Sequence, residues 1–201
     1  MRPILLFLSR AQAVLVVLAL VIAVTPPSAL RYGDRLQVAL PLLAWACAGS
    51  RREGAEFFLR YAVMFTTAHA AKTGLGGAEI NRRPDGGGKG FPSAHTSTAV
   101  LGASSLAHDC LRAAPVAQAA VIAAAAFVGA SRIEGHKHDI WQVLAGALLG
   151  YGCDRALRHP SPARSRLRAA LGRVMAALAS DGQRRLARLR LRVTGRLSRW
   201  T

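Results

Sequence analysis

The stretch Pro115–Ser131, PVAQAAVIAAAAFVGAS, decides the fold class, because it is apolar, carries no charged side chain and approaches the length of a transmembrane helix. Such a helix needs roughly 17 to 25 residues. Similar apolar stretches occupy residues 11–30, 35–50, 55–71, 93–109 and 139–153. Their even spacing predicts an all-α fold, a polytopic membrane helix bundle with about six transmembrane helices.

The positive charge of the chain is unevenly distributed. The formal net charge is +17, and residues 155–201 contain thirteen arginines against one acid, Asp181. We therefore divide the chain into a transmembrane domain at residues 1–153 and a basic amphipathic cytoplasmic tail at residues 154–201. Leucines recur at helical spacing in this tail, which favours binding to anionic lipid headgroups of the bilayer. No nucleic acid partner is expected, although nucleic-acid binding is the alternative for so basic a tail.

Two features bear on how the chain sits in a membrane. A cleaved signal peptide is the alternative for residues 11–30, but the length of this run and Pro26-Pro27 favour a retained first helix. Arg51-Arg52, Arg112 and the tail fall on one side of the bundle, which the positive-inside rule makes cytoplasmic. The sequence thus predicts an integral protein, of a bacterial inner membrane, with both termini cytoplasmic.

The same arrangement places the remaining loops and the thiols. The loops at residues 72–92 and 131–138 lie together on the outer face. Cys47, Cys110 and Cys153 fall near cytoplasmic helix ends, where thiols are expected to stay reduced.

Polar residues concentrate in those two outer loops, where a bilayer makes them costly. Pro92 suits the first turn of a helix, so Ser93 and His95 are expected at a helix N-terminus with free backbone N–H groups. Lys72, Arg83 and Arg132 are positioned to converge on the same anion. Their mixture of planar guanidinium groups and a compact ammonium group suits a tetrahedral phosphoryl group.

The sequence resembles the type 2 phosphatidic acid phosphatase family over roughly residues 55–152. That family carries the motifs Lys-x6-Arg-Pro, Pro-Ser-Gly-His and Ser-Arg-x5-His-x3-Asp. Here they read Lys72 to Arg83-Pro84, Pro92-Ser93-Ala94-His95, and Ser131-Arg132 to His138. The resemblance implies a phosphoric monoester or diphosphate hydrolase that acts on a phosphorylated lipid at the outer, periplasmic face.

The resemblance also implies a role for each matched residue. His138 attacks phosphorus and forms a phosphohistidine, and His95 is the general acid and base. The residues that hold the phosphoryl oxygens are Lys72, Arg83, Ser93 and Arg132. Positioning and charge neutralisation suffice for phosphoryl transfer, so we expect no cofactor and no metal.

Three positions depart from the family pattern. Gln142 stands where the family has the Asp that orients the nucleophile, and its amide oxygen can still accept a hydrogen bond from His138. Lys72 lies eleven positions before Arg83 instead of seven, which leaves Lys89 and Arg82 as competitors for the two roles. Ala94 replaces a glycine, at little cost if its dihedral angles are helical.

Two alternatives to a hydrolase remain from the sequence. A lipid phosphotransferase would use the same phosphohistidine and pass the phosphoryl group to another lipid. A non-catalytic membrane protein would keep the anion pocket without turnover, which Gln142 and the irregular first motif make conceivable.

Overall fold

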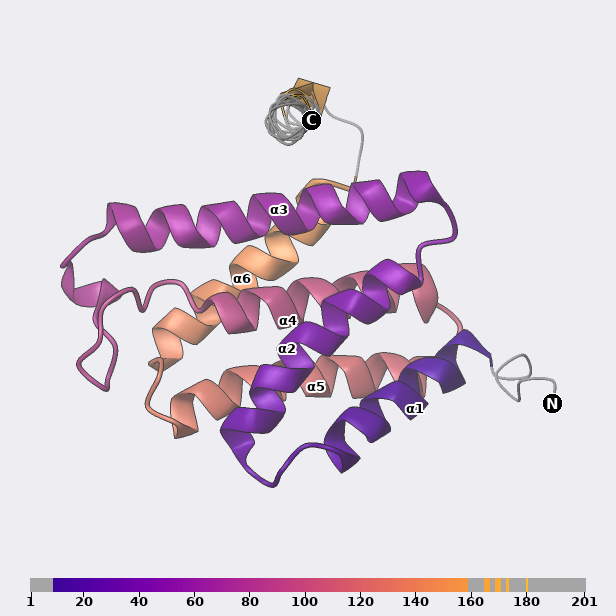
Figure 1. Cartoon of the computed structure of the whole chain (residues 1–201), viewed down its shortest axis with the longest axis horizontal. Coiled ribbons are helices and arrows are strands. Elements are labelled where there is room, and N and C mark those ends of the chain that lie inside the picture. The colour runs from indigo at the N-terminus through magenta and orange to yellow at the C-terminus, as the bar shows by residue number, and fades with distance from the viewer. Residues whose placement is uncertain (1–8, 159–164, 167–168, 171–172, 174–179, 181–201) are drawn as a thin grey trace, which may run out of the picture. The chain divides into compact units, whose positions relative to one another are not determined.

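The computed structural model describes residues 9–158, together with 165–166, 169–170, 173 and 180. Every regular element in these residues is helical, which confirms the all-α prediction. The α-helices are α1 (Arg10–Ala23), α2 (Ala29–Ala46), α3 (Arg51–Gly74), α4 (Ala94–Ser105), α5 (Pro115–Glu134) and α6 (Ile140–Ala156). A 3-10 turn, η2 (Glu79–Asn81), precedes α4, and a π-helical turn, η3 (Leu106–Cys110), follows it. Successive α-helices run in opposite directions through one bundle (Figure 1).

The first apolar run is shorter than predicted. α1 ends at Ala23 and α2 begins at Ala29, so the expectation of one continuous helix over residues 11–30 is wrong. Pro26 and Pro27 lie in the break, and prolines lack the N–H that a helix interior needs. The residues after them therefore start α2 and do not extend α1.

α4 is the central helix of the bundle and contacts α2, α3, α5 and α6. Glycines allow two of these close approaches. A Cβ on Gly102 of α4 would lie 2.6 Å from the backbone nitrogen of Pro41 in α2. On α6, Cβ atoms on Gly146 and Gly150 would lie 2.5 Å and 2.3 Å from the carbonyl oxygens of Ser93, the N-cap of α4, and Ser97 within α4. Small residues at these positions let the helix backbones touch.

A buried ionic cluster joins α3, α4 and α6 at the end of the bundle where α6 finishes. Asp154 is fully buried and lies 3.2 Å from Nε of Arg60 and 3.0 Å from a guanidinium nitrogen of Arg158. Ser104 and Ser105 donate hydroxyl hydrogen bonds to the same carboxylate. The charge of Asp154 is thereby satisfied in a place where an unpaired carboxylate would be costly.

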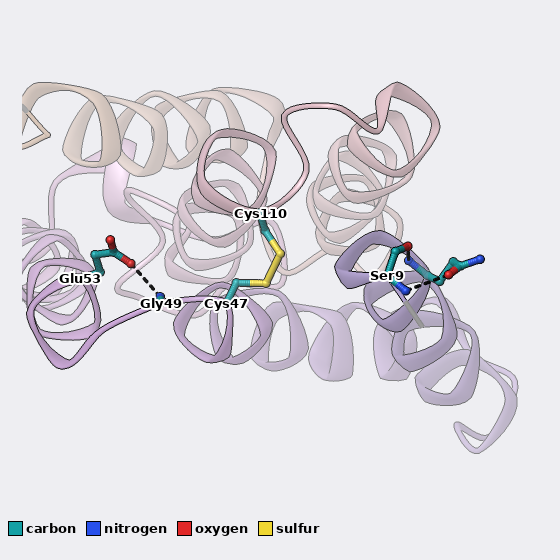
Figure 2. Close-up of a disulfide and its surroundings, with 6 residues drawn as sticks. Ser9, Cys47, Gly49, Glu53 and Cys110 are labelled. Atoms are coloured by element: carbon teal, nitrogen blue, oxygen red, sulfur yellow. Dashed lines mark hydrogen bonds between the residues drawn. A yellow bond between two sulfur atoms is a disulfide. The ribbon is translucent and has the colours of Figure 1, made fainter. Parts of the chain in front are cut away.

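A disulfide joins the C-terminal end of α2 to η3 at this same end of the bundle. The Cα atoms of Cys47 and Cys110 lie 5.8 Å apart and their sulfur atoms are bonded (Figure 2). Nearby, the carboxylate of Glu53 accepts a hydrogen bond from the backbone of Gly49. The expectation of reduced thiols is therefore wrong for Cys47 and Cys110, because helix packing pairs them, whereas Cys153 is a free thiol.

By length and composition, α5 is the one described helix that qualifies as a membrane span, and α1 is apolar but shorter. The chain divides into two compact units, residues 1–158 and 159–201. α6 continues to Ala156, so the first residues of the predicted tail belong to the bundle. The amphipathic helices expected in the tail fall largely outside the described residues.

Candidate active site

The predicted site residues come together at one end of the bundle. This is the end where α3 and α5 finish and where α2, α4 and α6 begin, at the left of Figure 1. Lys72 is in the last turn of α3, His95 in the first turn of α4, and Arg132 in the last turn of α5. Residues distant in sequence thus meet because the helices alternate in direction.

Gln142, in the first turn of α6, orients His138. The side chain of Gln142 is fully buried, and its Nε2 donates hydrogen bonds to the carbonyl oxygens of Ile80, at 3.1 Å, and Arg82, at 2.8 Å. These two acceptors fix the orientation of the amide, so its Oε1 must face His138 Nδ1, 2.9 Å away. Nδ1 of His138 therefore carries the proton, and its Nε2 keeps a lone pair for chemistry.

His138 is held in its neutral form. His138 lies in the loop that connects α5 to α6, and the residue is 3% exposed. Burial lowers the pKa of His138 to about 4, and the nearby charges of Lys72, Arg83 and His95 act in the same direction, against the hydrogen bond with Gln142. A neutral imidazole at neutral pH is what a nucleophile requires.

Lys72 and Arg83 point at the same carbonyl oxygen despite their unusual spacing. Nζ of Lys72 donates to the carbonyl of Lys89 at 2.7 Å, and the guanidinium of Arg83 approaches it at 3.5 Å. Asn81 organises the longer loop between them, since its amide group donates to Lys72 and Gly76 carbonyls and accepts from the backbone N–H of Phe91. The loop therefore absorbs the four additional residues.

The structure separates these two cations from their competitors. The side chains of Arg82 and Lys89 are exposed, whereas Lys72 and Arg83 act electrostatically on His138. Nε of Arg83 is buried and has no hydrogen-bond partner among the described residues. A buried unpaired donor beside a lysine is suited to an anionic ligand.

The start of α4 is tied to the start of α6. The backbone N–H of Ser93 donates to the carbonyl of Gln142 at 2.9 Å, and Ser93 Oγ accepts from the backbone N–H of Thr96, capping α4. Ser93 is fully buried, so its hydroxyl serves the helix cap. Ala94 is the first residue of α4, which makes its methyl group compatible with the family's glycine position.

Arg132 is fixed by a carboxylate that no motif includes. Its guanidinium donates to Asp34 Oδ1 at 2.8 Å and to the carbonyl of Leu30 at 2.7 Å. Asp34 Oδ1 also lies 3.2 Å from Nε2 of His95. Asp34 therefore links the predicted general acid to the predicted phosphate ligand. Sequence reasoning missed it because it falls between two apolar runs, and the only signal was an isolated acid close to one of them.

An open groove adjoins His95. It has a volume of about 500 Å³ and is lined mainly by apolar and aromatic side chains of α2, α3 and α4. Along α3 the rings of Phe57, Tyr61, Phe65 and His69 follow one another at four-residue spacing, with centroids 6.4, 6.1 and 4.0 Å apart. We call this the aromatic groove. It runs from the site along the bundle, because these α3 residues extend away from the helix end that carries Lys72.

A family model, the PAP2 superfamily, matches residues 11–166. The chain belongs to the PAP2 superfamily. This membership supports phosphatase-type activity, and no curated protein and no solved structure matches the chain. Gln142 is the position at which the third motif quoted above has Asp. Asp139 does not replace the missing carboxylate, because its Oδ1 caps α6 by accepting from the backbone N–H of Gln142.

No group of three or more His, Cys, Asp or Glu side chains in the described part of this PAP2 protein is placed to hold a metal ion. Asp34 supplies a single carboxylate at the site, and it is already paired with Arg132. The other charged or titratable side chains that meet there are the cations Lys72, Arg83 and Arg132 and the imidazoles of His95 and His138.

Proposed function

We propose that this protein is a membrane phosphatase that removes phosphate from a lipid phosphate or pyrophosphate by way of a phosphohistidine on His138. The observation that carries the proposal is the hydrogen bond from His138 Nδ1 to Gln142 Oε1, which leaves Nε2 unprotonated beside Lys72 and Arg83. A neutral nucleophile next to two cations matches what attack on a phosphoryl group requires.

In the first step, the lone pair of His138 Nε2 forms a bond to phosphorus while the bond from phosphorus to the lipid oxygen breaks. His95 gives a proton to that leaving oxygen. Nδ1 of His138 keeps its proton throughout, and the hydrogen bond to Gln142 strengthens as the imidazole becomes positive.

In the second step, water attacks the phosphohistidine. His95, now neutral, takes a proton from the water, and the phosphorus–nitrogen bond breaks to release inorganic phosphate. Lys72 and Arg83 neutralise the phosphoryl oxygens in both steps.

The aromatic groove supports a lipid as the substrate. His95, which protonates the leaving oxygen, is also one of the residues that line this groove. An apolar chain attached to the leaving oxygen can therefore lie along α3 while the phosphate is at Lys72 and Arg83.

We place the site on the periplasmic side of a bacterial inner membrane, because Arg51, Arg52 and Arg112 lie toward the opposite end of the bundle. The disulfide between Cys47 and Cys110 also lies at that opposite end, and disulfides persist in oxidising compartments. These two signals favour opposite orientations. We give the greater weight to the arginines, and we assign the basic tail to the same cytoplasmic surface.

The test is phosphate release by the purified protein in detergent from a panel of lipid phosphates and pyrophosphates, compared with soluble phosphate esters. We expect release from at least one lipid, and loss of it in His138→Ala and His95→Ala. Transfer of label to a second lipid instead of water would identify a phosphotransferase. Full release by His138→Ala would overturn the mechanism, and no release from any substrate would favour a non-catalytic protein.

A further inference from the structure

The side chain of Gln142 contacts two different parts of the site. Its Oε1 accepts from the imidazole of His138, and both hydrogens of its Nε2 are donated to backbone carbonyls of the loop that precedes Arg83. The loop encloses the amide from a second side, since a Cβ on Gly90 would lie 2.5 Å from Nε2. Gln142 is thus fully buried between the nucleophile and the loop of the first motif.

A carboxylate at this position would not make the same contacts. A carboxylate has only acceptor atoms when ionised, so one oxygen would face the carbonyl oxygens of Ile80 and Arg82 without a hydrogen between them. Those carbonyls would lose their donor in a buried place, and the carboxylate would be repelled by them. The amide of Gln142 therefore donates hydrogen bonds to the loop, which an ionised Asp cannot do.

The loop that Gln142 holds carries Arg83. The carbonyl of Arg82 belongs to the peptide bond that leads into Arg83, so fixing this carbonyl fixes the backbone from which the Arg83 side chain extends. The same loop contains η2 and the additional residues that separate Lys72 from Arg83. A longer loop has more conformations, so ordering it around a bound phosphate costs more conformational entropy. An anchor near the middle of the loop lowers this cost, because it orders the loop before phosphate binds.

We propose that Gln142 is a two-sided positioning residue, which aims His138 through its carbonyl oxygen and holds Arg83 in the phosphate site through its amide nitrogen. The inference rests on the proposed function and deepens it. Gln142 then aims the nucleophile, as the family's Asp does. It also anchors the first-motif loop, which needs an anchor because it is longer than in the family pattern.

The experiment compares phosphate binding with turnover in variants of the full chain. Gln142→Met keeps the length of the side chain and removes all its hydrogen bonds, while Gln142→Glu keeps the acceptor for His138 and removes the donors. We expect both variants to bind inorganic phosphate about tenfold more weakly by calorimetry. A residue that only aimed the nucleophile would lower kcat and leave phosphate affinity unchanged, and that result would overturn the proposal.

A double-mutant cycle with Arg83→Ala shows whether the effect passes through the arginine. We expect Gln142→Met to weaken phosphate binding little further once Arg83 is absent, and strict additivity would contradict the proposal. Higher activity of Gln142→Glu than of the unchanged protein would also contradict it. If the unchanged protein binds no phosphate and releases none from lipids, the proposed function itself fails, which is a different outcome.

Gln118 provides a matched control. Its Nε2 also donates to two backbone carbonyls, those of Ala107 at 3.3 Å and Leu111 at 2.9 Å, at the opposite end of the bundle. Gln118→Met therefore loses the same kind of contacts without touching the site. We expect its melting temperature to fall as in Gln142→Met and its phosphate affinity to stay unchanged. A matching loss of phosphate affinity in Gln118→Met would show that general destabilisation is the cause.

Discussion

His138 is neutral because of its surroundings, which gives the reaction a specific dependence on pH. Its pKa is lowered from 6.5 to about 4, chiefly by burial. We expect the nucleophilic step, measured with a phosphate ester whose leaving group needs no proton, to lose rate only as the pH approaches about 4. A midpoint near 6.5 would show that the imidazole is solvated and not buried.

The same shift has a consequence for stability. Unfolded His138 takes up a proton near pH 6.5, while the folded protein resists protonation down to about 4. The unfolded state therefore binds more protons in this interval, so the free energy of unfolding decreases as the pH falls through it. His138→Gln should remove this part of the pH dependence in thermal melting.

Asp34 contacts both His95 and Arg132, so we expect it to affect the reaction as well as the position of Arg132. Asp34→Asn removes the negative charge between His95 and Arg132, so it should disfavour the protonated form of His95 and lower kcat about tenfold. Affinity for inorganic phosphate should not fall, because the variant lacks a negative charge near the cations that are proposed to bind phosphate. Asp85→Asn, at an exposed acid paired with Lys137, is the control. Weaker phosphate binding with unchanged kcat would mean that Asp34 only holds Arg132.

The motif residues could be proposed from the sequence, whereas the residues that hold them in position could not. The types and order of Lys72, Arg83 and His138 predict an anion site without knowledge of contacts, and the structure brings these residues to one end of the bundle. Asp34 and Asn81 acquire their roles only through contacts with distant parts of the chain. The amide orientation of Gln142 likewise depends on carbonyls more than fifty residues away in sequence.

At the scale of helices, the contact between α4 and α6 sets the distance between the two halves of the site. Gly150→Ala would place a Cβ 2.3 Å from the carbonyl oxygen of Ser97, so we expect a loss of about 1–3 kcal/mol in stability. Gly152→Ala in the same helix meets no atom within 4 Å and should stabilise by roughly 0.5–1 kcal/mol. Equal melting temperatures for the two variants in detergent would show that the helices are not in close contact.

Apolar runs predicted each of the helices α1 to α6 in the described residues 9–158, because each needs an apolar surface to enter the bundle. The boundaries were less predictable, as the break at Pro26-Pro27 shows. The disulfide could not be anticipated from Cys47 and Cys110, since only the packing of α2 against η3 brings them together.

At the scale of the whole molecule, we propose that the bundle lies in a membrane with its site end outside, and cysteine labelling tests this orientation. In a variant without native cysteines, Gly88→Cys marks the exposed loop of the site and Arg51→Cys marks the opposite end. We expect an impermeant maleimide to label Gly88→Cys in intact cells and Arg51→Cys only after permeabilisation. The reverse pattern would place the disulfide end outside and contradict the orientation.

The most direct test of the central claim is trapping of the phosphoenzyme. The protein is mixed with a lipid phosphate labelled in its phosphoryl group, quenched in alkali, and mapped by mass spectrometry. We predict a label on His138 that is stable to alkali and labile to acid, and that is absent from His138→Ala. A labelled residue other than His138, or phosphate release from the lipid by His138→Ala at the unchanged rate, would contradict the account.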